Sequence, residues 1–255
     1  MSQPQQDALF QFALRLGDNN LIHGHRLSEM CSYGPFLEED IATTNIALDH
    51  IGQARLMLSF AGEIEGKGRS EDDLAYSRMP EEYRNALLVE QPNIDFGVMT
   101  AKQLFYSTCA YLLQTGLAKS KNETLAAYAV KALKETTYHL RHSREWTLRL
   151  GDGTEESHQR MQEAVNSLWM YTGDLFAATE GDKLLLAEGI IPDLSVIRES
   201  WFNEIEKILK EATLVMPAKD AWQMKGSREG KHTEQLSYIL GEMQYLTRAY
   251  PGAKW

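Results

Sequence analysis

Apolar residues recur at helical spacing along almost the whole chain. Segments rich in Leu, Ala, Glu, Gln and Met dominate, and the alternating β-branched runs that are typical of strands are absent. This pattern predicts an all-α protein. Four long helices are expected in the first 150 residues, over about 5–31, 37–61, 95–119 and 123–150. The Gly-Asp-Asn-Asn stretch at 17–20 is expected to be a local irregularity in the first helix.

The segment at 62–94 separates the second helix from the third. It is rich in Gly, Asp, Pro and charged residues, and Pro80 is expected to start a short helix there. Two antiparallel hairpins joined by one long crossover are typical of the ferritin-like four-helix bundle, whereas a simple up-and-down bundle has three short loops. We predict a single ferritin-like domain over 1–255, with the four-helix core at 1–150. Additional helices at 151–255, the last over about 232–249, are expected to pack on that core.

Composition narrows the classes of function. The chain has 255 residues, of which 43% are hydrophobic, and a formal net charge of -10, which argues against a nucleic-acid-binding surface. Its two cysteines cannot form a disulfide framework. The polar N-terminus lacks a secretion signal, and no apolar run approaches the roughly 18 residues of a membrane span. We therefore expect a cytoplasmic protein that binds neither nucleic acid nor membrane.

Polar residues interrupt the apolar faces of the second and fourth helices. They are Asn45, Asp49 and Gln53 on the second helix and Glu135, His139 and His142 on the fourth. The apolar stripe interrupted on the second helix consists of Ile41, Leu48 and Ile51. Polar residues at core spacing are what a metal site inside a bundle requires. Because Tyr128, Ala132 and Trp146 flank the same face of the fourth helix, an inward orientation is favoured over the alternative of solvated faces.

The stretch from Lys134 to His139 resembles a di-iron ligand helix without one of its ligands. Di-iron bundles take a Glu and a His three residues apart on one helix, but Thr136 occupies the glutamate position here. Glu135 is four residues before His139, offset by about 100° from Thr136. A complete site needs about four carboxylates and two histidines, and the second helix offers only His50 and Gln53 at the corresponding place.

The other two helices do not complete the ligand set. The third has Lys102, Gln103, Ser107 and Thr108 in its inner region and no carboxylate between its ends, and the first has His23, His25 and Glu29, which alone cannot hold two irons. We therefore expect no metal in this chain, and a hydrogen-bonded polar core instead. That vestigial core is expected to comprise Asp49, Gln53, Glu135, Thr136 and His139.

Two literal Glu-x-x-His strings lie outside the bundle helices. Glu155 and His158 follow Thr154, which is expected to cap a new helix, and early glutamates favour the helix dipole. Glu229 and His232 lie in a glycine-punctuated loop that fixes no ligand geometry. Neither string is expected to bind metal.

Several separated motifs resemble the structural C subunit of bacterial phenylacetyl-CoA 1,2-epoxidases. They include Glu-Glu-Asp-Ile-Ala at 38–42, Asn-Ile-Ala-Leu-Asp at 45–49, Leu-Val-Glu-Gln-Pro-Asn at 88–93, Tyr-His-Leu-Arg-His-Ser at 138–143 and Arg-Ala-Tyr-Pro-Gly at 248–252. The resemblance extends essentially end to end. It implies a structural, non-catalytic subunit that forms a heterodimer with a homologous catalytic partner, in which a di-iron centre epoxidises the ring of phenylacetyl-CoA in phenylacetate degradation.

The resemblance also implies where the cofactors lie. The matching motif of the catalytic partner has a ligand glutamate at the position of Thr136, and its second-helix Glu-x-x-His corresponds to His50 and Gln53. No ligand role transfers to this chain. The expected further partners are a reductase with flavin and iron-sulfur groups and a small subunit, and phenylacetyl-CoA itself is a candidate ligand.

Two segments are candidates for contact with the acyl-CoA. In the first, a hydroxyl, a guanidinium and a helix start could converge on an anion; its residues are Tyr76, Ser77, Arg78 and Met79. In the second, small residues precede a capping threonine; its residues are Ala177, Ala178 and Thr179. An ordinary loop or cap is the alternative for both.

Two further questions stay open at the level of sequence. The aromatic tail with Tyr245, Tyr250 and Trp255 could bind the catalytic partner or pack on its own chain. The rival function is a free-standing di-iron or di-manganese enzyme with atypical ligands. Those ligands would come from Asp49, Glu135, His139, His142 and either His25 or Glu29.

Overall fold

The hydrophobic pattern places the four longest helices close to their predicted positions. In the computed structural model, which describes residues 2–253, these are α1 (Gln3–Ser28), α2 (Leu37–Glu65), α4 (Phe96–Leu117) and α5 (Glu123–Gly151). The described residues contain no strand. Asp95 and Asn122 cap α4 and α5 by accepting from the backbone N–H groups of Val98 and Leu125.

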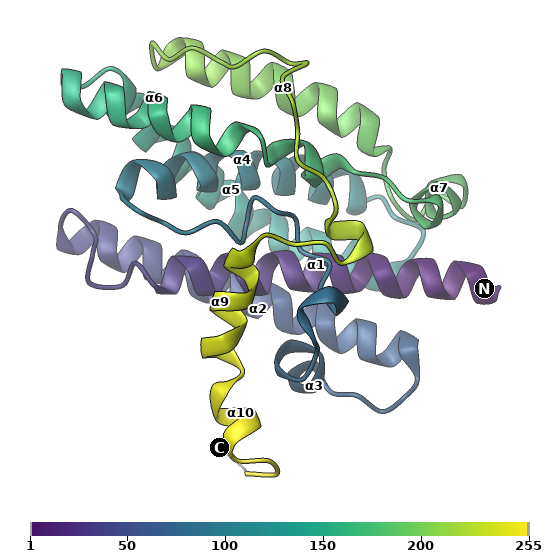
Figure 1. The fold of residues 1–255 in the computed structure, drawn as a ribbon. Coiled ribbons are helices and arrows are strands. Elements are labelled where there is room, and N and C mark those ends of the chain that lie inside the picture. The colour runs from purple at the N-terminus through teal and green to yellow at the C-terminus, as the bar shows by residue number, and fades with distance from the viewer. Residues whose placement is uncertain (1, 254–255) are drawn as a thin grey trace.

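The four long helices form two hairpins, α1 with α2 and α4 with α5 (Figure 1). The crossover between the hairpins contains the short helix α3 (Glu71–Tyr76) and a 3-10 turn at Pro80–Glu82. The turn lies where Pro80 predicts a helix start, whereas the sequence pattern does not predict α3. Two hairpins with one long crossover confirm the all-α, ferritin-like fold class.

Helix α1 lies very close to α2 at two glycines. A Cβ added to Gly17 would lie 2.6 Å from Leu58 Cδ2, and one added to Gly24 would lie 3.2 Å from the carbonyl oxygen of Ala47. The predicted irregularity at 17–20 is therefore wrong, because α1 is continuous there. The polar residues of this stretch are buried and bind partners on other helices and on the crossover, among them Asp18 with Arg78 and Asn19 with the backbone N–H of Ala86.

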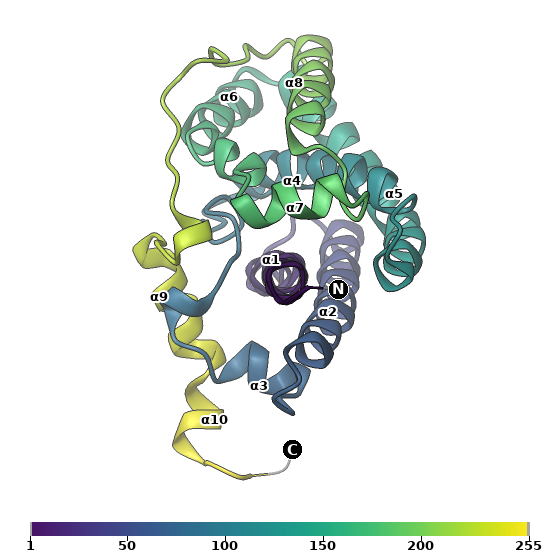
Figure 2. The same ribbon diagram turned by 90° about the vertical axis from the view of Figure 1, so that its right-hand side faces the viewer.

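The later helices cover α4 and α1. Helices α6 (Glu155–Trp169) and α8 (Leu194–Glu211) pack on α4, and α7 (Glu180–Ala187) lies on α1 (Figure 2). Trp201 is completely buried in this layer, and its indole N–H donates to the carbonyl of Phe105 at 2.9 Å. No helix within residues 2–253 is long and apolar enough to cross a membrane.

The chain ends in two short helices rather than the single one predicted. Helices α9 (Glu234–Met243) and α10 (Tyr245–Ala249) are separated at Gln244. The Gln244 amide donates to the carbonyl of Arg78 at 2.9 Å and to the Tyr83 hydroxyl at 3.0 Å, which ties this break to the crossover. Tyr245 and Tyr250 are exposed, and Trp255 lies outside the described residues.

Candidate functional site

The four long helices meet around a layer of buried aromatic and polar side chains. His23 comes from α1, His50 from α2, Tyr106 from α4 and His139 from α5, and all four are buried. The ring centroid of His50 is 4.8 Å from those of both His23 and His139. The three histidines therefore form a continuous imidazole row across the centre of the bundle.

Each histidine of the imidazole row has one hydrogen-bond partner. His23 Nε2 donates to Gln103 Oε1 at 2.6 Å; Gln103 in turn donates through its amide to Ser107 at 3.1 Å. His50 Nδ1 lies 2.8 Å from Asn20 Oδ1. The other ring nitrogens of His23 and His50, and Nδ1 of His139, have no partner within the described part of the chain.

Burial disfavours the charged forms of His23, His50 and Lys102 inside this site. Desolvation, reinforced by the nearby Lys102, lowers the pKa of His23 to about 3. Desolvation also holds the pKa of His50 well below its ordinary value, with smaller contributions from His139 and His23. The pKa of Lys102 is likewise held well below its ordinary value by burial, and its Nζ donates to the carbonyl of Gln91 at 2.5 Å.

The carboxylates of the site lie at its edge rather than at its centre. His139 Nε2 is 2.9 Å from Asp49 Oδ2, and the side chain of Asp49 is 38% exposed. Gln53 donates to Glu135 Oε2 at 2.8 Å. Gln53 Oε1 accepts from Gln114 at 3.3 Å. Asp49 is thus bound to an imidazole of the interior, and Glu135 to an amide.

The structure brings together most of the predicted polar core. Gln53, Thr136 and His139 are buried, as the inward orientation predicts, while Asp49 and Glu135 are intermediate. Thr136 Oγ1 has no hydrogen-bond partner among residues 2–253. Of the residues thought to flank this face, Tyr128 and Ala132 are buried and Trp146 is only half-buried.

The predicted inner stripe of α2 is wrong for two of its three residues. Ile41 is 52% exposed and Leu48 is 63% exposed, while Ile51 is half-buried. Asn45 is also exposed. The residues that face the core are instead Thr43, Ile46, Ala47, His50, Gln53, Ala54, Met57, Leu58 and Ala61. Because both sides of α2 carry apolar residues, hydrophobic periodicity alone does not identify the side that faces the core, and the prediction chose the outer side.

The donor set does not fit a di-iron centre. Such a centre needs about four carboxylates around two irons, whereas the central donors here are imidazoles, amides and hydroxyls. Across residues 2–253, no group of three or more His, Cys, Asp or Glu side chains is arranged to hold a metal ion. The rival ligand set is also dispersed, because His142 binds Glu39 at 2.7 Å and Glu29 pairs with Arg26 at the surface.

The two literal Glu-x-x-His strings have structural roles. Thr154 caps α6 by accepting from the backbone N–H of Ser157, as predicted, and His158 Nδ1 lies 2.6 Å from the carbonyl oxygen of Gly151. Glu229 ends a 3-10 turn (Ser227–Glu229) and pairs with Lys231. His232 instead contacts the buried carboxylate of Glu90 at 2.9 Å.

In the first acyl-CoA candidate, the guanidinium of Arg78 points inward. Arg78 is buried, forms a two-pronged ion pair with Asp18, and stacks on the Tyr83 ring at 4.1 Å. Tyr76 is half-buried, and Ser77 and Met79 are exposed. The predicted convergence of hydroxyl, guanidinium and helix start on one anion is therefore not what the structure shows. A substrate contact by this segment stays a prediction.

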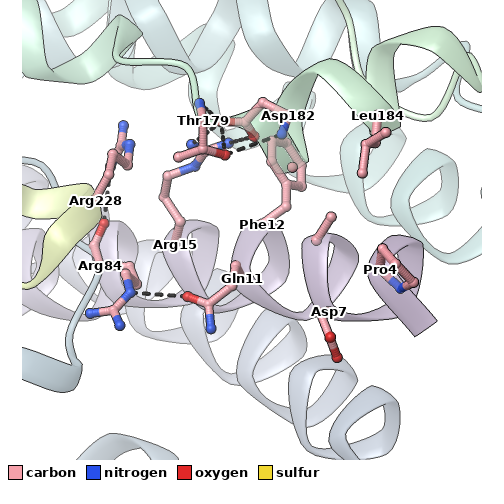
Figure 3. Close-up of a pocket in the computed structure, with 12 residues that line it drawn as sticks. Pro4, Asp7, Gln11, Phe12, Arg15, Arg84, Thr179, Asp182, Leu184 and Arg228 are labelled. Atoms are coloured by element: carbon pink, nitrogen blue, oxygen red, sulfur yellow. Dashed lines mark hydrogen bonds and ion pairs between the residues drawn. The ribbon is translucent and has the colours of Figure 1, made fainter.

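The second acyl-CoA candidate borders a cavity of about 440 Å³ between α1 and α7 (Figure 3). Thr179 lines this cavity and caps α7 by accepting from the backbone N–H of Asp182. Ala177 and Ala178 precede it on the connection from the 3-10 turn Thr172–Phe176. Three arginines reach the same cavity, namely Arg15, Arg84 and Arg228.

Sequence reasoning missed Arg15, Arg228 and the buried carboxylate of Asp182, which hold this region. Arg15 makes a buried two-pronged ion pair with Asp182, at 2.6 and 3.0 Å. Arg228 donates to the carbonyls of Ala177 and Asp174, and burial lowers its pKa to about 9. Their partners are up to 167 residues away along the chain, so helical periodicity carries no signal for them. Polar residues inside an otherwise apolar helix were the available clue.

The family model for phenylacetic acid catabolic proteins matches residues 1–255. The chain therefore belongs to the family of phenylacetic acid catabolic proteins, helical proteins of the ferritin-like class. It is 47% identical over 247 residues to the C subunit of the 1,2-phenylacetyl-CoA epoxidase of Escherichia coli strain K12, and this match covers 97% of the chain and 99% of that relative. The resemblance identified from the separated motifs is thus confirmed.

Proposed function

We propose that this chain is the structural, non-catalytic subunit of an epoxidase that acts on phenylacetyl-CoA in phenylacetate catabolism. Its partner is a homologous protein that carries the di-iron centre. The observation that carries this proposal is the interior of the bundle, where His50, Gln53 and Thr136 are buried at the positions that, by the resemblance, correspond to metal ligands of the catalytic partner. The relative in Escherichia coli, which is named as a subunit of such an epoxidase, supports it.

A division of labour between the two homologous proteins explains the uncharged core. Oxygen chemistry takes place at the partner's metal, with electrons from a reductase that carries flavin and iron-sulfur groups, and the complex also contains a small subunit. This chain holds no cofactor. Each imidazole of the row has one hydrogen bond, and a buried polar group without any would cost about 1 to 3 kcal/mol. The result is a rigid scaffold with the shape of a di-iron bundle.

Reconstitution from separately purified proteins tests this function. The catalytic partner, the reductase and the small subunit are mixed with and without this chain, and oxygen-dependent conversion of phenylacetyl-CoA is followed by liquid chromatography. We expect turnover only when this chain is added, co-elution with the catalytic partner, and no turnover by this chain with the reductase alone. Full activity without this chain would contradict the proposal.

We further propose that the cavity between α1 and α7 contacts the coenzyme A part of the substrate. Thr179 lies on its wall, and Arg84 reaches it while donating to Gln11 at 3.0 Å (Figure 3). Because guanidinium groups bind phosphate well, Arg84→Gln is expected to raise the KM for phenylacetyl-CoA in the assembled complex. Arg144→Gln, which removes a surface arginine bound to Glu211, is the matched control. An unchanged KM for Arg84→Gln would remove this part of the proposal.

A further inference from the structure

Helix α2 has a second apolar stripe on its outer side. Ile41, Leu48 and Leu56 are 52%, 63% and 40% exposed, and they are separated by seven and eight residues. At roughly 100° per residue, these positions lie on one face of the helix, and Asn45 and Gly52 lie on the same face. We call these five residues the outer stripe. Repeated apolar residues at this spacing are typical of a helix that packs against another helix.

The outer stripe borders a groove between α2 and α5. Two adjoining hollows, of about 100 and 490 Å³, share the side chains of Leu56 and Lys131. Together they form what we call the α2–α5 groove. Its lining residues include Leu48, Asp49, Gly52, Gln53, Leu56, Met57, Glu123, Ala127, Tyr128, Lys131, Ala132 and Glu135. The groove lies between α2 and α5, and these two helices are on the side of the bundle away from α9 and α10 (Figure 2).

Gly52 leaves room for another molecule to approach this groove closely. A glycine inside a helix costs about 0.5 to 1 kcal/mol relative to alanine, so it usually has a packing reason. Gly17 and Gly24 have one, because an added Cβ would meet α2. An added Cβ at Gly52 meets no atom within 4 Å. The surface at Gly52 is therefore open to the close approach of a backbone from outside, and its place between Leu48 and Leu56 in the groove distinguishes it from other open glycines of the chain.

The charges of the groove select the occupant. The groove is lined by three acidic residues, Asp49, Glu123 and Glu135, and by one basic residue, Lys131. A second copy of this chain, which itself has a net charge of -10, would bring the same acidic groove against itself. A helix with apolar residues three or four apart and a Lys or Arg among them complements both the outer stripe and the carboxylates.

We propose that the α2–α5 groove binds one such basic, amphipathic helix of the catalytic partner, with its backbone packed against Gly52. This inference rests on the proposed function, which supplies the catalytic partner, and it identifies the surface of this chain that the partner contacts. The helix lies along the outer stripe, and its cation reaches Asp49 or Glu135 at the mouth of the polar core. Docking would thereby also exclude water from the exposed side of the Asp49 carboxylate.

Two glycine variants test the site of docking. Gly52→Leu fills the groove without a clash inside the chain, so the melting temperature of the isolated chain is expected to stay the same or rise. Its Kd for the catalytic partner, measured by biolayer interferometry, is expected to weaken by about tenfold or more. Gly241→Leu is the matched control, because Gly241 is also exposed in a helix and its added Cβ also meets nothing within 4 Å. We expect its Kd to equal that of the wild type.

The outcomes separate this inference from the proposed function. If the wild type and Gly52→Leu bind the catalytic partner equally well, the groove is not the docking site, and the proposed function stands. If Gly241→Leu alone weakens binding, the contact lies near the aromatic tail and the inference is overturned. If the wild type does not bind at all, both fail. A self-associating chain that Gly52→Leu turns into a monomer, seen by analytical ultracentrifugation, would assign the groove to a second copy and also overturn the inference.

Discussion

The imidazole row makes the stability of this protein sensitive to mild acid, and His23 is the residue to test. Its ring is completely buried and donates to Gln103. The substitution His23→Gln keeps a group that can donate to Gln103 but removes the titrating ring. The quantity to compare is the change in the free energy of unfolding between pH 7 and pH 5. The packing change caused by the substitution is present at both pH values and cancels, so the difference reports the protonation of the ring.

The magnitude follows from the two pKa values of His23. In the folded protein burial lowers the pKa from 6.5 to about 3, so the folded state stays unprotonated while the unfolded chain takes up a proton below pH 6.5. Stability is therefore lost as the pH falls below 6.5, at about 1.4 kcal/mol per pH unit. At pH 5 this loss is roughly 2 kcal/mol for His23 alone. The lowered pKa of His50 acts in the same direction.

Urea unfolding at both pH values, followed by tryptophan fluorescence, measures the effect. The wild type is expected to lose about 2 kcal/mol more than His23→Gln between pH 7 and pH 5. The same substitution at His158, outside the imidazole row, is the matched control for losing a histidine. Equal pH dependence in the wild type and His23→Gln would refute the account of a neutral, buried His23.

Three other substitutions test the buried polar contacts. Arg78→Leu leaves the buried Asp18 carboxylate without its ion-pair partner, although the backbone N–H of Arg84 still donates to it. The substitution is expected to cost about 3 to 5 kcal/mol in urea unfolding, whereas a small cost would contradict the buried ion pair. Glu135→Leu leaves the Gln53 amide without its acceptor and is expected to cost about 1 to 3 kcal/mol; turnover of a complex that still assembles should persist, and its loss would argue for chemistry in this chain. The carboxylate of Glu90 contacts His232 and accepts from Thr233, and Glu90→Gln replaces one of its acceptor oxygens by an NH₂ group, which weakens this attachment. Limited proteolysis is therefore expected to cut within residues 232–253 faster than in the wild type, and unchanged cleavage would show that this carboxylate does not hold the C-terminal helices.

Much of the fold could be predicted because the long helices have strong internal signals. Capping residues such as Asn122 and Thr154 and the terminating Gly151 stand next to apolar periodic segments, and these signals are local. The crossover was recognised by its composition. Helix α3 and the break at Gln244 were missed, because six residues carry little periodicity and Gln244 is fixed by the distant Tyr83 and Arg78.

The candidate site was only partly predictable. The absence of a glutamate at Thr136 and the presence of His139 were visible in the sequence, and both side chains are buried together. Asn20, which forms a hydrogen bond with His50, was not predicted as a core residue because the Gly-Asp-Asn-Asn stretch at 17–20 resembles a turn. The inner face of α2 was misassigned because Ile41, Leu48 and Leu56 also place apolar residues at helical spacing on the outer side. That error is informative, since an apolar side that the chain does not cover indicates a contact with another molecule.

The metal content of this chain in its complex tests the central claim most directly. The complex is assembled with the catalytic partner under anaerobic conditions with excess ferrous iron, the two chains are separated without denaturation, and iron and manganese are measured by mass spectrometry. A structural subunit with the neutral core around His50 and Thr136 is predicted to carry no stoichiometric metal, while about two irons stay with the catalytic partner. Two equivalents of iron or manganese per copy of this chain would contradict the account and favour the free-standing enzyme.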